Sequence, residues 1–262
     1  MKLSKLINFL EEKFPKYLAE EWDNVGLLVG KRDSEVERVL LSLDITEKVI
    51  DKAIEIGANL IITHHPMIFK PLKNITGDTL TGKKIIRLIE NKISVYSMHT
   101  NLDSSKSGLN DFLGETILGL KDGKILDSSE KNGIEYGIGR IYKLNEVLSI
   151  EKLSEILKEK LGLDSITVVK ANEIKGIKKI ALVSGSGASY WRKAKKLGAG
   201  VLITGDVKYH EAMGAKEENF SLIDIGHFES EWVFSNLLED VLTKEFEIET
   251  TIFNDGPIFE KM

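Results

Sequence analysis

Short apolar runs alternate with amphipathic segments in the first part of the chain. Residues 39–43 and 60–62 are apolar runs, and residues 47–56 between them carry apolar side chains at helical spacing. This alternation predicts parallel strands joined by crossover helices. Chemistry in such sheets gathers at the carboxyl ends of the strands, where Asp44, His64 and His65 fall.

The pattern recurs later in the chain. Residues 180–183 match 39–42, and residues 201–204 match 60–63, both at an offset of 141. A further match, 94–103 against 222–231, has an offset of 128 and leaves 13 extra residues between the second and third strands of the first copy. Generic βαβ units also resemble each other, but the shared landmarks favour duplication.

We therefore predict an α/β fold of two intertwined, similar units related by duplication, with mixed sheets flanked by helices. The expected first domain is 1–125 plus 226–262, and the expected second domain is 126–225.

The middle of the chain has less regular patterning. Residues 122–133 are polar and contain glycine, which predicts a surface crossover. Residues 134–144 and 165–169 are expected to be strands. An amphipathic helix is predicted at 149–161, with Ser149 as its N-cap and Glu151 in its first turn.

Composition narrows the class of protein. The 262 residues are 42% hydrophobic, which is ample for a buried core. A net charge of -5 without a concentrated basic face argues against nucleic acid as the primary partner. No run of 18 apolar residues and no secretory leader is apparent, so we expect a soluble cytoplasmic protein without a membrane partner.

A histidine is followed four residues later by a carboxylate in two places. Because the chain has no cysteine, any metal must have nitrogen and oxygen ligands, which suit zinc, iron, manganese or nickel. A pair of ions needs about five or six protein groups, including a bridging carboxylate. The candidate ligands that meet this count are His64, His65, Asp103, His227 and Glu231.

The roles of these residues differ in our interpretation. If the strand continues through Pro66, His64 and His65 point to opposite sides and serve different ions, bridged by Asp103 or Glu231. His99, the repeat counterpart of His227, is expected to orient a ligand or contact a substrate rather than bind metal. Ordinary polar groups at strand ends are the alternative, but the clustering of histidines favours a metal site.

His210 is a second candidate for catalysis. It follows Asp206 by four residues, so the two would share a helix face, with His210 moving protons near the metals. A histidine in a solvated first helical turn is an equal alternative.

Two further motifs have weaker signals. The turn 184–189 could hold an anion through backbone N–H groups, although glycine in a tight strand-to-helix turn for geometry alone is the favoured reading. Residues 21–30 (EWDNVGLLVG) read as a turn with a core tryptophan. With no P-loop, nucleophile elbow or cysteine, activated water is the most plausible nucleophile.

Several separated motifs resemble, in order, those of the Nif-three-like family, also catalogued as GTP cyclohydrolase type 2 homologs. They are residues 21–30, ITHHP at 62–66, HTNLD at 99–103, TGDVKYHEA at 204–212 and GHFESE at 226–231. The resemblance implies a toroidal homohexamer of two-domain subunits with two divalent metal ions each. The family's ligands fall on His64, His65, Asp103, His227 and Glu231.

The chain resembles the family's short form, without the additional domain that longer members carry between the halves. The family name suggests a cyclohydrolase in which activated water attacks the guanine imidazole ring. Our first hypothesis is a metal-dependent hydrolase of a small anionic or nucleotide-like molecule. The alternative is a non-catalytic, ring-shaped metal-binding or interaction protein.

Overall fold

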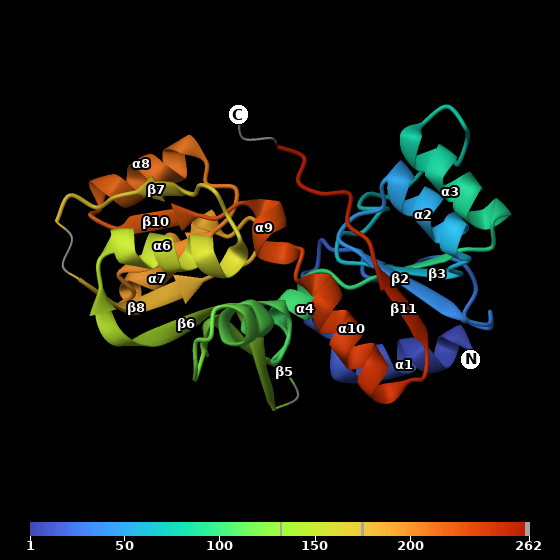
Figure 1. Ribbon diagram of the computed structural model, residues 1–262, viewed down its shortest axis with the longest axis horizontal. Coiled ribbons are helices and arrows are strands. Elements are labelled where there is room, and N and C mark those ends of the chain that lie inside the picture. Colours follow the sequence, from blue (N-terminus) through green and yellow to red (C-terminus); the bar gives the residue numbers. More distant parts are fainter. Residues whose placement is uncertain (132, 174–175, 260–262) are drawn as a thin grey trace. The chain divides into compact units, whose positions relative to one another are not determined.

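The computed structural model describes residues 1–131, 133–173 and 176–259, and the chain divides into two compact units (Figure 1). Unit 1 comprises Met1–Leu102 and Phe234–Met262, and unit 2 comprises Asp103–Val233. Residues 103–125 and 226–233, which we expected in the first domain, therefore belong to unit 2. Unit 1 is discontinuous, because unit 2 is inserted between its two segments.

Unit 1 is built on a five-stranded mixed sheet. Its strands are β1 (Gly26–Val29), β2 (Arg38–Ser42), β3 (Leu60–Thr63), β4 (Ser94–Ser97) and β11 (Glu249–Ile252), in the order β1-β4-β3-β2-β11. Only the β1–β4 pairing is antiparallel. The central strands are buried along their length, as their apolar runs predict.

Helices cover both faces of this sheet. In Figure 1, α2 (Glu47–Ile56) and α3 (Leu80–Glu90) lie on one face, and α1 (Leu3–Lys13) and α10 (Phe234–Glu245) lie on the other. Alternate residues of a strand point to opposite faces, so Leu40 and Ile61 pack against α2 and α3. The helix predicted at 47–56 is confirmed, and Thr46 caps it by accepting a hydrogen bond from the Val49 N–H.

Unit 2 is built on a six-stranded mixed sheet. Its strands are β5 (Lys124–Lys131), β6 (Ile134–Leu148), β7 (Thr167–Val169), β8 (Ile177–Leu182), β9 (Val201–Thr204) and β10 (Ser221–Asp224), in the order β5-β6-β8-β9-β10-β7. The crossover predicted at 122–133 is wrong for most of its length, since β5 forms an antiparallel hairpin with β6. Residue 132 lies outside the described residues. Most residues of strand β5 face solvent and only Leu126 in it is buried, so the strand tolerates a polar sequence.

Helices also flank the second sheet. They are α6 (Ile150–Leu161), α7 (Trp191–Lys196), α8 (Tyr209–Glu217) and the short α9 (His227–Glu231). Trp191 of α7 and Ala215 of α8 pack with Ala181 and Leu202 of the sheet into one core. The predicted cap of α6 is confirmed, because the Lys152 N–H donates to Ser149 Oγ at 3.1 Å.

Strand register supports the predicted duplication. Val39 pairs with Leu60 in unit 1, and Ile180 pairs with Val201 in unit 2, so both partners move by the same 141 residues. In the third strand Ser94 corresponds to Ser221 rather than Leu222, because these residues pair with Leu60 and Val201. The predicted offset of 128 is therefore wrong within this strand, where the offset is one residue smaller. The extra residue of unit 2 comes after β10, where Gly226 adopts a φ of +94°.

No helix among the described residues combines the length and apolar character needed to cross a membrane.

Candidate metal centre

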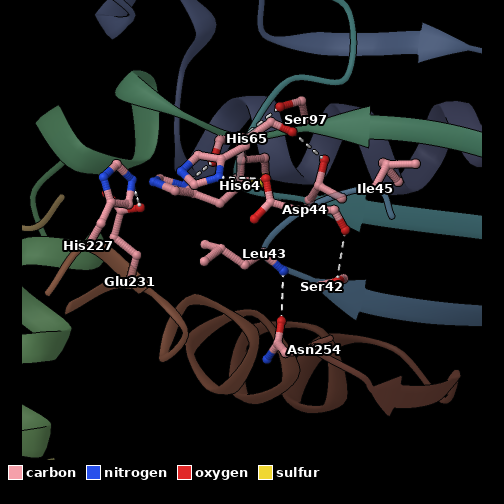
Figure 2. Close-up of polar contacts among 12 residues, drawn as sticks. Ser42, Leu43, Asp44, Ile45, His64, His65, Ser97, His227, Glu231 and Asn254 are labelled. Carbon is pink, nitrogen blue, oxygen red and sulfur yellow. Dashed lines mark hydrogen bonds and ion pairs between the residues drawn. The ribbon is translucent and has the colours of Figure 1, made fainter. Parts of the chain in front are cut away.

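His64 and His65 follow directly after β3 in unit 1. The His64 side chain is fully buried, and its Nδ1 lies 2.8 Å from the Met98 carbonyl oxygen. A carbonyl only accepts, so Nδ1 carries the proton, which leaves Nε2 as the nitrogen with a lone pair for a metal ion. His65 Nδ1 lies 2.9 Å from Asp44 Oδ1, and Figure 2 shows the two side chains turned toward each other.

These two rings lie next to each other. Strand β3 ends at Thr63, whose hydroxyl donates to the His65 carbonyl, so strand alternation no longer applies to the two histidines. Their centroids are 5.2 Å apart. The expectation that they point to opposite sides is wrong because the strand does not continue through Pro66. Which ion each histidine would bind stays a prediction.

His99 joins this cluster in unit 1. Its ring centroid lies 5.1 Å from that of His64 and 5.6 Å from that of His65. One nitrogen from each of the three rings lies within 4.8 Å of the others, so the cluster could hold a metal ion. His99 is thus close enough to be a ligand itself, although we assigned it a supporting role from the sequence.

Asp23 holds His99 in place. Its Oδ1 lies 2.9 Å from His99 Nδ1, and its Oδ2 accepts from the Thr100 N–H and hydroxyl at 3.0 and 2.5 Å. Burial raises the pKa of this carboxyl, but the hydrogen bonds from His99 and Thr100 outweigh burial and lower the pKa to about 2. Asp23 is therefore an anion that fixes the tautomer of His99. Sequence reasoning missed it, although it lies in the motif at 21–30.

Unit 2 contains a second pair of donors on α9. His227 Nε2 lies 2.9 Å from Glu231 Oε2, because residues four apart share a helix face (Figure 2). His227 Nδ1 lies 2.7 Å from Asp206 Oδ2. Asp206 corresponds to His65 at the offset of 141, and His227 corresponds to His99 at the offset of 128. The hydrogen bond between His227 and Asp206 in unit 2 therefore stands where unit 1 has the ring contact between His99 and His65.

Asp103 lies on α4 (Thr100–Ser104) at the start of unit 2. Its side chain is largely buried, and the Ser184 hydroxyl lies 3.5 Å from its Oδ1. The segment after α4 is fixed by Arg140, a fully buried residue on β6 that binds Asp111 through Nε and Nη2 at 2.5 and 2.9 Å. Arg140 Nη2 also donates to the Ser105 carbonyl. No signal in the sequence singled out Arg140.

The turn at 184–189 serves packing in this structure. The N–H of Ser184 donates to Asn110 Oδ1, that of Gly185 donates to Ser230 Oγ, and that of Gly187 donates to Thr204 Oγ1, all at 2.9 Å. These donors are engaged within unit 2, which agrees with glycine being there for geometry. A Cβ at Gly185 would lie 2.9 Å from Cδ of Glu231, so the turn closely approaches this carboxylate.

His210 lies in the first turn of α8 and is exposed, with its ring near that of Tyr209. Asp206 and His210 do not share a helix face, because α8 begins at Tyr209 and Asp206 has a left-handed φ of +54°. The expectation of a shared face is therefore wrong. A catalytic role for His210 stays a prediction.

The donor set fits a divalent metal ion. Each of the four histidines that follow β3, β4 and β10 has its Nδ1 within 2.9 Å of a carbonyl or carboxylate oxygen: His64, His65, His99 and His227. Metal-binding histidines are oriented in this way, which fixes Nε2 as the ligating atom. Nitrogen and carboxylate donors suit zinc, iron, manganese and nickel.

The chain is similar to known proteins over nearly all of its length. The model of the Duf34/NIF3 (NGG1p interacting factor 3) family matches residues 1–256. A Clostridium perfringens protein named GTP cyclohydrolase 1 type 2 homolog is 48% identical over 233 residues, which are 88% of this chain and 87% of that protein.

Solved structures share the fold of this chain. A hypothetical protein of Staphylococcus aureus superposes with a TM-score of 0.91 at 31% identity, covering 100% of this chain and 99% of the other. The structure of reduced HcgD from Methanocaldococcus jannaschii superposes with a TM-score of 0.82 at 33% identity, covering 96% of this chain and 97% of the other. With its sequence matched by the family model and its α/β architecture shared with these structures, the chain belongs to the Duf34/NIF3 family.

Proposed function

We propose that this protein binds divalent metal ions and uses them to hydrolyse a small anionic or nucleotide-like molecule. The observation that supports metal binding best is the shared orientation of His64, His65, His99 and His227, whose Nδ1 atoms are all engaged. A ring whose Nδ1 donates to an oxygen presents its Nε2 to a metal ion, as metal-binding histidines do.

The ligands we propose are those that the family resemblance implies: His64 and His65 from unit 1, and Asp103, His227 and Glu231 from unit 2. A divalent ion in such a shell supplies Lewis acidity toward water and toward an anionic substrate. The number of ions and their sharing of ligands stay predictions.

His99 and its partner Asp23 supply the proton chemistry in this proposal. Because the ionised Asp23 accepts a hydrogen bond from Nδ1, it favours the tautomer whose Nε2 can accept a proton. Asp23 also stabilises the imidazolium that forms when His99 is protonated. The hydrolase class is supported by the names of the relatives.

Elemental analysis tests the proposal at its base. Protein purified without chelators or affinity metals should contain about two ions per chain, and the variants His64→Ala and Glu231→Ala should lose metal. Formate release from GTP, together with a panel of nucleotides and phosphoesters, then tests turnover. The variant His99→Gln should keep its metal but lose most activity if His99 moves protons.

Metal-free wild-type protein, or turnover that survives removal of the metal, would contradict the proposal. Tight, stoichiometric metal without activity on any of these compounds would favour the non-catalytic metal-binding protein.

A further inference from the structure

Two exposed aromatic side chains lie beside the histidine cluster of unit 1. Trp22 is 57% exposed and Phe69 is 46% exposed, yet their ring centroids are only 5.6 Å apart, at an interplanar angle of 45°. The Trp22 ring also contacts His99 edge-on, with centroids 6.0 Å apart. The aromatic pair therefore adjoins the side chain to which we assign proton transfer.

Hydrogen bonds of the adjacent residues hold both aromatics in place. Asp23, next to Trp22, is bonded to His99 and Thr100. The Asn24 side chain donates to the carbonyl of Ile68, the residue before Phe69, at 2.5 Å. These bonds join the segment that carries Trp22 to the segment that carries Phe69. The pair is thus pre-organised, which lowers the entropic cost of binding a ligand.

The exposure of Trp22 is not explained by packing. Trp191, which is fully buried in the core of unit 2, shows how the fold accommodates a structural tryptophan. The sequence predicted the same for Trp22, and the structure contradicts that prediction. A rigid aromatic face left in water is well suited to stack against a planar ring, because stacking recovers apolar burial and dispersion energy.

One exposed charged residue of each sign adjoins the aromatic pair in the sequence. Lys70, which follows Phe69, and Glu21, which precedes Trp22, are both exposed. A phosphate on the stacked ring would favour the Lys70 side of the pair, since a lysine ammonium attracts phosphate and a carboxylate repels it. A planar ring and a phosphate together describe a nucleotide-like molecule.

We infer that Trp22 and Phe69 bind the planar nitrogen heterocycle of the substrate and present it to His99. This inference rests on the proposed function and gives it a substrate class: a nucleobase-like ring that carries a phosphate. Trp22 and Phe69 determine specificity here and take no part in the chemistry.

Matched ligands and matched variants test this inference. Guanosine 5′-monophosphate and ribose 5-phosphate share a phosphate and sugar but differ in the ring, and their affinities are measured by calorimetry on wild-type protein. Trp22→Leu keeps an apolar side chain without a π face, whereas Trp22→Phe keeps an aromatic ring. Phe69→Leu and Phe69→Tyr form the same kind of pair. Metal content is measured on every variant.

The expected result is that the wild type prefers guanosine 5′-monophosphate over ribose 5-phosphate by on the order of tenfold, the gain typical of one stacked base. Trp22→Leu should remove this preference, Trp22→Phe should keep part of it, and metal content should not change. Ligand binding should also quench the fluorescence that distinguishes wild type from Trp22→Phe.

Equal affinity for the two ligands, or a preference that survives in Trp22→Leu, would overturn the inference. So would a change of oligomeric state in Trp22→Leu by light scattering, because a second copy of the chain would then cover the aromatic pair. The same titrations on chelator-treated protein measure the ring preference without turnover, so metal-free wild-type protein would defeat the proposed function while the ring preference is still measured.

Discussion

Replacing Gly185 with alanine tests whether the turn at 184–189 controls the Glu231 carboxylate. Gly185 has a φ of +61°, a conformation that costs an L residue about 1–2 kcal/mol. The added Cβ would also lie 2.9 Å from Glu231 Cδ, closer than real Cβ contacts allow. Because Glu231 is only 4% exposed, its carboxylate has little room to move away without leaving His227.

Gly162→Ala is the matched control. Gly162 ends α6 with a similar φ of +67°, but a Cβ there would meet no atom within 4 Å. This variant should lose only the cost of placing an L residue in the left-handed conformation, about 1–2 kcal/mol of unfolding free energy. Gly185→Ala should lose a further amount of about 1–3 kcal/mol, typical of forcing extra atoms into a packed site.

Urea denaturation gives the two free energies, and calorimetry with Zn²⁺ gives the metal affinity. We expect Gly185→Ala to weaken metal binding by roughly 10–100-fold, the range found when the support of a ligand is disturbed, and Gly162→Ala to leave it unchanged. Equal losses of stability in the two variants, with wild-type metal affinity in both, would refute the reasoning.

Three other substitutions and one assembly measurement follow from the structure. Asp206→Asn should weaken metal binding at His227 roughly tenfold by calorimetry, whereas Asp240→Asn on the exposed face of α10 should not. The folded-state pKa of Asp23 is lowered from 3.8 to about 2, so its ionisation stabilises the fold above pH 4 and this contribution, about 2 kcal/mol, is lost as pH falls from 4 to 2. Asp23→Asn should therefore flatten the stability profile measured by urea titration in that window; a profile identical to wild type would contradict the assignment. Arg140→Met leaves a buried carboxylate uncompensated and should cost about 3–5 kcal/mol in urea denaturation; a loss below 1 kcal/mol would contradict this. The homohexamer implied by the resemblance is checked by multi-angle light scattering, and a monomeric mass would count against it.

Strands and helices with a clear apolar period were predictable from the sequence. The runs at 39–43 and 60–62 became β2 and β3, and Ser149 caps α6 as expected. Strand β5 was not predictable, because a mostly exposed hairpin strand has no apolar alternation. The extra residue after β10 was not predictable either, since one additional residue in a turn leaves the flanking motifs intact.

The histidines of the site were predictable because they follow apolar runs, but most of their partners were not. Asp23 lies 76 residues from His99 along the chain, and only the folded sheet brings them together. Asp44 was visible at the end of its strand, yet its bond to His65 depends on the register between β2 and β3. The adjacency of His64 and His65 depended on where β3 ends, which periodicity locates poorly.

The discontinuity of unit 1 has a consequence for how the chain folds. Helix α10 and strand β11 complete the first sheet, but the ribosome makes them only after all of unit 2. During synthesis the edge of β2 that pairs with β11 stays open, while unit 2, which is continuous, already has every strand it needs. The inserted unit can therefore complete its fold first, whereas unit 1 is completed only when its C-terminal segment has been made.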